Sequence, residues 1–404
     1  MNTTMDTNGR ERQRRNRLLW VLCGATFLIF FQAFMVAPLL PRLAQVFSVP
    51  IQTIGLIVPA YLIPYGVATL VYGPLSDWLG RRPILVGSLA AFVVLTALTA
   101  TAQSAQALLV LRLLTGLGAS GVVPLALAFT GDVVPYSERG RALGWLFGAM
   151  AGGIAFGSTA GAVLEPFLTW QGLFLGVAVL AALVFVALLP RLSELRAQPS
   201  PQAKRSFGEV LSAYGTLLHE RRGLRTYAYV LFTGLFHSGT FTWLGLYFAQ
   251  RYRLGEVGIG LALLGYGLPG FLFGPLIGRA ADRWGRRRLI PLGIAIGGAA
   301  ACALALDVPL PVAVLLVTAL SLSYDMTQPL LAGIVTDLSQ QRGLAMGLNV
   351  CTLFTGFGLG SLLLSTLLPL GLGAAYAIFG GVALFAALVA VPLFRMERHP
   401  TPGA

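Results

Sequence analysis

GPLSDWLGRR at residues 73–82 and GRAADRWGRR at residues 278–287 are two versions of one charged segment, each set between long apolar runs. Asp77 and Asp282, within these segments, are 205 positions apart. Further pairs share this offset or one of 203: Asp132 with Asp337, Gln45 with Gln250, Gly144 with Gly347, Gly153 with Gly356, and Gly157 with Gly360. Repetition at a fixed offset predicts that the chain consists of two copies of one structural unit.

The composition indicates a membrane protein. Of the 404 residues, 56% are hydrophobic and 11% charged, whereas soluble domains carry about 25% charged residues. Because a bilayer-spanning segment must satisfy its own backbone hydrogen bonds over about 20 apolar residues, the long apolar runs predict helices. We therefore predict an all-α integral membrane protein whose twelve transmembrane helices form two pseudo-symmetric six-helix bundles. The expected spans are 18–40, 51–72, 84–102, 107–130, 141–163, 168–190, 226–248, 256–277, 289–306, 311–335, 344–368 and 373–394.

Basic residues determine the expected orientation. Nearly all of the 28 Lys and Arg residues fall in loops on the side of the N-terminus, and only Arg42, Arg251 and Arg253 fall in loops on the other side. Since Lys and Arg accumulate in cytoplasmic loops, we expect both termini in the cytoplasm. The compact chain and its short loops lead us to expect a bacterial inner membrane. Contact of these loops with anionic lipid accounts for the net charge of +13 without a nucleic-acid partner.

The same pattern predicts the domain organisation. We expect an amphipathic helix on the inner membrane surface within the linker, because apolar residues between 207 and 218 follow one helical face. The segments are a basic cytoplasmic tail (1–17), an N-terminal six-helix bundle (18–190), a cytoplasmic linker (191–225), a C-terminal six-helix bundle (226–394) and a second cytoplasmic tail (395–404).

Two six-helix halves, each with the loop pattern Gly-x-x-x-Asp-x-x-Gly-Arg-Arg, resemble the major facilitator superfamily of secondary transporters. The resemblance covers about residues 18–394 and implies two bundles around a cavity that opens alternately to each side of the membrane. It also implies a cytoplasmic latch of the outward-facing state, although the same residues also suit simple topological anchors. The latch would comprise Gly73, Asp77, Gly80, Arg81 and Asp132 in the first half, and Gly278, Asp282, Gly285, Arg286 and Asp337 in the second.

Two motifs resemble those of the drug:proton antiporter family. In the expected fifth helix, Gly144, Gly153, Gly157 and Gly161 follow the spacing of a glycine motif, with Ser158 where that family has Pro. Close helix packing is the alternative role for these glycines. In the fourth helix, RLLTGLGAS at 112–120 resembles an Arg-x-x-x-Gly-x-Gly motif, whose Arg the family links to proton transfer. Pairing of Arg112 with carbonyl groups is the structural alternative.

Two further residues are expensive to place within a membrane. Asp325 falls in the expected tenth helix and His237 in the seventh, at the offset of 205 from Gln32 in the first helix. We expect Asp325, with His237 and Arg112 nearby, to carry a proton; a static buried pair and recognition of a cationic substrate are the alternatives. Polar stripes and aromatic residues on the first, seventh and tenth helices predict the cavity lining: Gln32, Phe34, Thr233, Thr240, Trp243, Thr318, Ser321 and Gln328.

The function predicted from these patterns is export of lipophilic or amphipathic small molecules in exchange for protons, by a monomer. A metabolite or sugar transporter, working as facilitator or proton symporter, is the alternative, and a receptor or scaffold without flux is a third. The sequence has no nucleotide-binding loop, catalytic triad or metal-ligand spacing, and its three Cys lie in apolar runs. We therefore expect no enzyme activity, no cofactor and no metal site.

Overall fold

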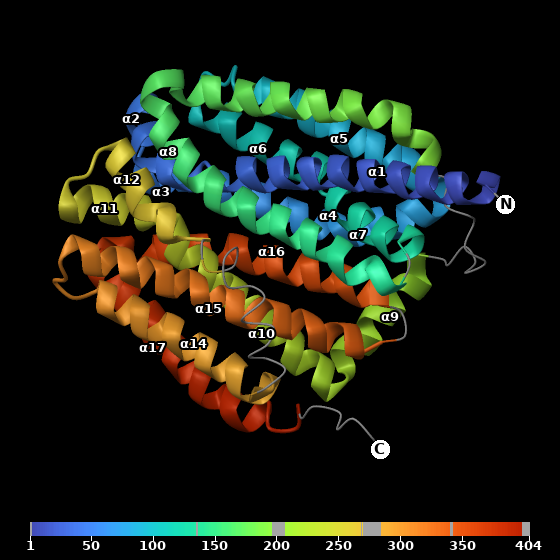
Figure 1. Cartoon of the computed structure of the whole chain (residues 1–404). Helices are drawn as coiled ribbons and strands as arrows, with labels where there is room; N and C mark the ends of the chain where they lie inside the picture. Colours follow the sequence, from blue (N-terminus) through green and yellow to red (C-terminus); the bar gives the residue numbers. More distant parts are fainter. Residues whose placement is uncertain are drawn as a thin grey trace.

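The computed structural model describes residues 2–134, 136–195, 207–267, 269, 284–339 and 342–397. Within these ranges the regular structure is helical, and the helices form two elongated bundles that lie side by side (Figure 1). The starts of α1 and α10 and the end of α17 lie at one end of the molecule, which we call the terminal end. The short helices α2, α3, α11 and α12 lie at the opposite end (Figure 1).

Each bundle is built from consecutive chain. The first contains α1 (Asn2–Phe34), η1 (Ala37–Leu39), α2 (Leu40–Phe47), α3 (Ile51–Gly55), α4 (Ile57–Leu79), α5 (Arg81–Thr99), α6 (Ala105–Ala119), α7 (Val122–Val133), α8 (Tyr136–Leu188) and η2 (Leu189–Leu195). The connecting helix α9 (Phe207–His219) precedes the second bundle. That bundle contains α10 (Arg221–Thr242), α11 (Leu244–Tyr252), α12 (Glu256–Ala262), η3 (Leu263–Gly265), α14 (Arg286–Leu304), α15 (Leu310–Asp337), α16 (Arg342–Leu367), η4 (Leu368–Leu370) and α17 (Leu372–Leu393).

Nine helical stretches in the described part of the chain are long and apolar enough to cross a membrane. One of them, Gly144–Leu192, has 49 residues, about twice the length that a bilayer requires. Its helix α8 breaks at Thr169, whose backbone has φ 59° and ψ 164°. The basic segment before residue 18 continues α1, which begins at Asn2.

The doubled charged segment has the same backbone geometry where both copies are described. Gly80 separates α4 from α5 with φ +90°, and Gly285 precedes α14 with φ +77°. Positive φ favours glycine because a Cβ would meet the following carbonyl group. Gly80 therefore ends α4 and permits α5 to begin at once with arginine, and Gly285 likewise directly precedes the arginine that begins α14.

Glycines bring two pairs of helices into backbone contact, one pair in each bundle. A Cβ added to Gly153 of α8 would lie 2.5 Å from the Phe27 oxygen of α1, and Gly157 is equally tight against Phe31. A Cβ on Gly161 would lie 2.5 Å from the oxygen of Met35, directly after α1. A Cβ on Gly356 of α16 would lie 2.5 Å from the Leu231 oxygen of α10. By contrast, nothing lies within 4 Å of such an atom on Gly144. Gly144 is therefore not one of the glycines through which α8 packs closely against α1.

The two bundles meet along α4 with α16 and along α8 with α12. The contact between α4 and α16 is close, since a Cβ on Gly66 of α4 would lie 2.8 Å from Cβ of Phe354 in α16. At the opposite end, the ring of Trp243 covers Gly55 of α3, at 2.6 Å from a Cβ built there, and Pro38 of η1 packs on Gly245 of α11. The bundles are thus in contact at the opposite end.

Helix α9 packs against the C-terminal bundle. Val210, Tyr214 and Leu217 form a buried cluster with residues of α10, α15 and α16. Leu211 points away and is 61% exposed. The apolar face expected to lie on a membrane surface is therefore largely covered by protein, because the ends of α15 and α16 present apolar side chains to it.

Candidate functional site

Arg112 of α6 is completely buried in the N-terminal bundle. Its Nη1 donates to Oε1 of Gln32 at 2.9 Å, and its Nε donates to the Ile57 carbonyl at 3.3 Å. Nη2 donates to the Ala33 carbonyl at 3.4 Å. The guanidinium carbon also lies 4.2 Å from the ring centroid of Tyr61. A buried cation is thus held by dipoles and an aromatic face, which matches the structural alternative of carbonyl pairing.

Three polar groups around this arginine are buried and have no hydrogen-bond partner in the part of the chain that the structure describes. They are Nε2 of Gln32 and the hydroxyls of Tyr61 and Tyr65, the latter two on α4. The two tyrosine rings stack with centroids 5.9 Å apart. Buried polar groups are nearly always paired in folded proteins, so a cluster of unpaired ones marks a special site.

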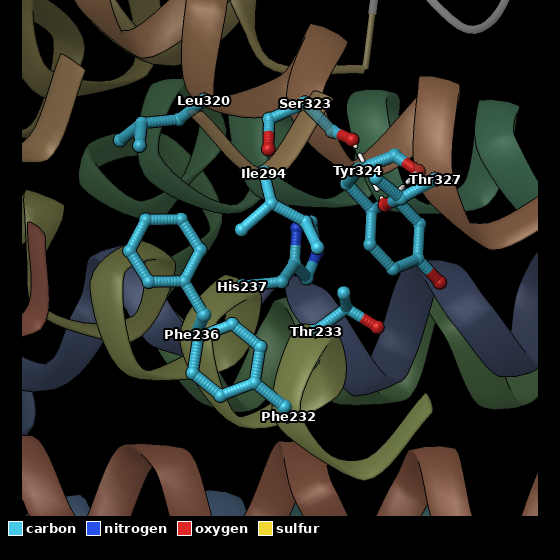
Figure 2. A pocket seen from close by; sticks show the side chains of 9 residues that line it. All are labelled: Phe232, Thr233, Phe236, His237, Ile294, Leu320, Ser323, Tyr324 and Thr327. Carbon is cyan, nitrogen blue, oxygen red and sulfur yellow. Dashed lines mark hydrogen bonds between the residues drawn. The ribbon is translucent and has the colours of Figure 1, made fainter. Parts of the chain in front are cut away.

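His237 of α10 is buried in the C-terminal bundle beside two tyrosines. The Tyr266 hydroxyl lies 2.6 Å from Nδ1 of His237, and the Tyr324 ring stacks on the imidazole at a centroid distance of 3.9 Å. Figure 2 shows His237 and Tyr324 together, with Phe232 and Phe236 on the side of α10. The cavity between these side chains has about 10 Å³, room for a single water. This half of the site is closed around its histidine.

Asp325 of α15 is partly buried and lies in the same region. Ser321, one turn earlier, donates a hydrogen bond to Oδ2 of Asp325 at 3.2 Å. Ser321 itself accepts a bond from the backbone N–H of Gly267 at 2.8 Å. Gly267 follows Tyr266 in the chain. The hydrogen bonds of these two neighbouring residues therefore connect the carboxyl group of Asp325 in α15 with His237 in α10.

The predicted cavity residues divide into two groups. Gln328 of α15 donates to the Thr233 hydroxyl of α10 at 2.7 Å, so the predicted polar stripes of α15 and α10 face one another at this point. Thr240 and Thr318 instead donate to carbonyl groups of their own helices. Trp243 donates to the carbonyl of Ser361 at 3.1 Å. These last three side chains support helix packing in this conformation, because each polar atom is already occupied within the protein.

Aromatic side chains close the space between the group around Arg112, which we call the N-terminal half-site, and the group around His237, which we call the C-terminal half-site. Phe354 of α16 stacks on Tyr65 at 4.5 Å between centroids and lies 5.9 Å from Phe30 of α1. Phe357, one turn later, lies 6.1 Å from Phe34 and 5.4 Å from His237. A continuous aromatic layer therefore separates the Arg112 group from the His237 group, with rings contributed by both bundles.

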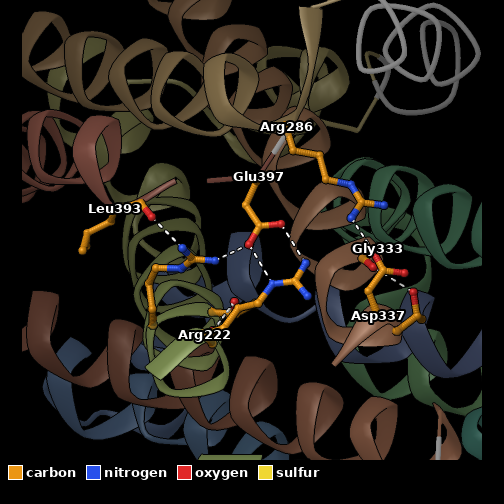
Figure 3. A network of polar contacts seen from close by, with 9 residues as sticks. Arg222, Arg286, Gly333, Asp337, Leu393 and Glu397 are labelled. Carbon is orange, nitrogen blue, oxygen red and sulfur yellow. Dashed lines mark hydrogen bonds and ion pairs between the residues drawn. The ribbon is translucent and has the colours of Figure 1, made fainter. Parts of the chain in front are cut away.

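At the terminal end, the second copy of the charged segment forms an ion pair. Arg286, at the start of α14, donates to Oδ2 of Asp337 at the end of α15 at 2.7 Å (Figure 3). Gly73 of α4 has nothing within 4 Å of an added Cβ, and Arg81 opens α5. The remaining predicted latch groups, namely the side chains of Asp77 and Asp132 and residues Gly278 and Asp282, lie outside the described residues.

A second polar network at this end was not predicted from the sequence. Glu397 accepts hydrogen bonds from Nε and Nη2 of Arg222 at 2.9 and 2.8 Å, and another from Arg225 (Figure 3). Burial opposes ionisation of Glu397, but the two arginines outweigh it and lower the pKa of its carboxyl group. The residues after α17 are thereby fastened to the start of α10.

Sequence reasoning also missed Tyr61, Tyr65 and Phe354. One signal was present, because Tyr61 and Tyr266 are separated by the same 205 positions as Gln32 and His237. Applying the offset to every polar aromatic residue would have found this pair. Phe354 carried no comparable signal, since its importance comes from the contact between α4 and α16.

No cluster of three or more potential metal ligands occurs among the side chains that the structure describes. The site is instead a set of buried polar and aromatic groups between two helical bundles of membrane-spanning composition. This combination defines a membrane transporter class rather than a soluble enzyme class.

Comparison with known proteins identifies the family. The Major Facilitator Superfamily profile matches residues 22–263 and 253–404, so the chain belongs to this superfamily of transporters and is not an enzyme. The Bacillus subtilis (strain 168) protein described as "Uncharacterized MFS-type transporter YceJ" is 28% identical over 352 residues, covering 85% of this chain and 87% of that protein.

Two other similarities are informative. The chloramphenicol resistance protein of Pseudomonas aeruginosa is 34% identical over 151 residues, or 37% of this chain and 36% of that protein. The solved structure of the human organic anion transporter MFSD10 (TETRAN) has a TM-score of 0.73 at 21% identity, covering 93% of this chain and 99% of that one. At this identity the likeness concerns the fold alone. The protein is thus a membrane-embedded transporter with relatives among drug-resistance proteins.

Proposed function

We propose that this protein exports small lipophilic or amphipathic organic compounds in exchange for protons, by alternating access. Membership of the superfamily supports transport of a small molecule by a monomer, and similarity to a drug-resistance protein supports export. The aromatic layer formed by Phe30, Tyr65, Phe354 and Phe357 suits compounds with large apolar surfaces.

Twelve membrane-spanning helices are part of this proposal. The helix α8 is long enough for two crossings and breaks at Thr169. The pair α10 and α11 runs from Arg221 to Tyr252 and is of spanning length, although polar residues lower its hydropathy. The remaining crossing would be the predicted span 256–277, of which the structure describes only 256–267 and residue 269. Basic loops would place the terminal end in the cytoplasm of a bacterial inner membrane.

One observation carries the coupling proposal: the bonded path from Asp325 through Ser321 to Gly267, whose neighbour Tyr266 contacts His237. A carboxyl group in a membrane-spanning helix is costly and rarely lacks a function. When the bundles move, the surroundings of Asp325 change between apolar and polar, and its proton affinity changes with them. Asp325 would carry the proton, with His237 shaping the polarity of its surroundings. Arg112, which the aromatic layer separates from His237 in this conformation, would act on Asp325 only when the bundles have moved.

The Arg286–Asp337 pair supports a latch at the cytoplasmic side. Arg286 is held at the first turn of α14 and Asp337 at the last turn of α15, so the pair ties two helices together at their ends. A pair with one partner 35% and the other 48% exposed contributes little to stability, about 0 to 1 kcal/mol. Such a pair suits a contact that must form and break during transport.

Inverted membrane vesicles with an acidified lumen test the coupling. Neutral, cationic and anionic lipophilic compounds are added while a fluorescent dye reports lumenal pH. We expect proton release with wild type but none with Asp325→Asn. Asp307→Asn is the matched control, because Asp307 is an exposed acid at the opposite end, paired with Arg251, and it should behave as wild type.

The alternative of a facilitator gives a different outcome. If labelled compound crosses the membrane equally fast with and without a gradient, and Asp325→Asn does not alter the flux, proton coupling is refuted. Asp325 would then be a structural residue of α15.

A further inference from the structure

The N-terminal half-site contains buried hydrogen-bond donors that are not used within the protein. Nε2 of Gln32 and the hydroxyls of Tyr61 and Tyr65 are buried and have no hydrogen-bond partner among the described residues. Burial of an unpaired donor costs free energy that a folded protein rarely tolerates at three adjacent positions. These groups are therefore candidates for contacts that form only when something else occupies the site.

The three donors belong to one group around Arg112. Gln32 accepts from Nη1 of Arg112 through its oxygen, which leaves its Nε2 beside the guanidinium. Tyr61 lies under the guanidinium, and Tyr65 stacks on Tyr61 one turn along α4. Any acceptor that reaches one of these donors thus also enters the field of a buried positive charge.

Arg112 itself has no carboxylate partner among the residues that the structure describes. In the part of the chain that the structure describes, its partners are carbonyl oxygens, an amide oxygen and an aromatic ring, and no carboxylate lies at ion-pair distance. A buried charge balanced only by dipoles attracts an anion strongly, because the surrounding medium screens poorly. A planar guanidinium also binds a carboxylate through two parallel N–H···O bonds, which adds both energy and geometric specificity.

The aromatic contacts indicate how the group becomes accessible. Phe354 of α16 covers the ring of Tyr65, and α4 and α16 belong to different bundles. Separation of the bundles along this seam uncovers the tyrosine rings and their hydroxyls together. The uncovered surface then offers aromatic faces next to unpaired donors, which suits a ring that bears an acidic group.

We propose that Gln32, Tyr61, Tyr65 and Arg112 form a binding subsite for organic anions, specifically an aromatic compound bearing a carboxylate. This inference rests on the proposed transport function and adds the charge of the substrate. The pseudo-equivalent of Tyr61 in the other half, Tyr266, has its hydroxyl occupied by His237. The subsite is therefore confined to the N-terminal bundle.

Calorimetry on the full-length protein in lipid nanodiscs tests the proposal without any proton gradient. Three probes share one biphenyl body: the carboxylate, the carboxamide and the methylammonium. We expect the carboxylate to bind at least about tenfold more tightly than the methylammonium. The double variant Tyr61→Phe/Tyr65→Phe should lose about tenfold in carboxylate affinity, because two donors disappear. Its melting temperature should not fall.

The matched control is Tyr229→Phe/Tyr376→Phe, whose hydroxyls donate to the carbonyls of Ala386 and Thr240. This control should melt earlier and bind the carboxylate as wild type does. Equal or tighter binding of the methylammonium, binding of none of the three probes, or unchanged carboxylate affinity in the Tyr61→Phe/Tyr65→Phe variant would each overturn the subsite. Because no gradient is present, these outcomes are independent of whether Asp325 couples protons.

Discussion

The two bundles share one scaffold but place different chemistry on it. At positions related by 205 residues, the N-terminal bundle has Gln32 and Tyr61, and the C-terminal bundle has His237 and Tyr266. In the first, Tyr61 is unpaired beside a buried arginine; in the second, the tyrosine is bonded to histidine. The difference suggests that one half presents donors to the substrate, while the other half handles the proton.

The charged residues show the same division. The position equivalent to Arg112 is Val317, which is buried and apolar. The position equivalent to Asp325 is Ser120, whose hydroxyl donates to its own helix at the Leu117 carbonyl. Each half therefore has one charge that the other lacks. A duplicated fold allows such divergence, because the packing seams do not include these positions.

The shared scaffold is tested by substitution of its glycines, for which we expect the largest effects. Gly157→Ala and Gly360→Ala each place a methyl group against a backbone carbonyl of the neighbouring helix. Neither backbone yields easily, so each variant should lose about 3 kcal/mol or more of stability, as for overpacked cores. Gly144→Ala, with open space around it, should melt as wild type in a fluorescence assay. Equal melting temperatures of all three variants would refute the close helix packing at Gly157 and Gly360.

Arg112→Lys tests the N-terminal half-site. Lysine preserves the charge but cannot donate simultaneously to Gln32, Ile57 and Ala33. We expect binding of the biphenyl carboxylate to weaken by about tenfold to a hundredfold in calorimetry, since the subsite loses its geometry. Arg42→Lys, at a partly exposed pair with Glu165, is the control and should bind normally. Wild-type affinity in Arg112→Lys would exclude the arginine from the site.

His237→Gln tests the C-terminal half-site. Glutamine can still bond to a tyrosine hydroxyl, so the contact with Tyr266 is preserved while the imidazole ring that stacks on Tyr324 is lost. We expect proton release in vesicles to fall by about three- to tenfold, with carboxylate affinity unchanged in nanodiscs. A loss of affinity equal to the loss of proton release would contradict the division between the halves.

Glu397→Gln tests the contact at the terminal end, where we expect the smallest effect. Because the folded-state pKa of Glu397 is lowered, the ionised form adds stability above the usual Glu pKa of about 4.5, and this stability is lost as the pH falls through the lowered value. The variant should melt a few degrees below wild type near pH 7. The two melting temperatures should converge in acid; a constant difference would show that ionisation is irrelevant.

Much of the scaffold was predictable from the sequence, because apolar length and repetition are properties of the chain itself. The offset of 205 residues related Gln32 to His237 and the first charged segment to the second. The close packing at Gly153 follows from its place in the glycine spacing of the expected fifth helix. The unpaired hydroxyl of Tyr61 was not predictable, since it depends on which atoms of other helices fail to reach it. Glu397 was missed for a similar reason, because nothing local to the tail indicates its arginine partners on α10.

We propose that the N-terminal half mainly holds the substrate and the C-terminal half mainly holds the proton. Counterflow in vesicles separates the two roles: labelled biphenyl carboxylate exchanges against unlabelled compound at equal pH on both sides. We expect Asp325→Asn to exchange at about the wild-type rate yet release no protons under a gradient, whereas Arg112→Lys should fail in both assays. Loss of exchange in Asp325→Asn, or normal exchange in Arg112→Lys, would contradict it.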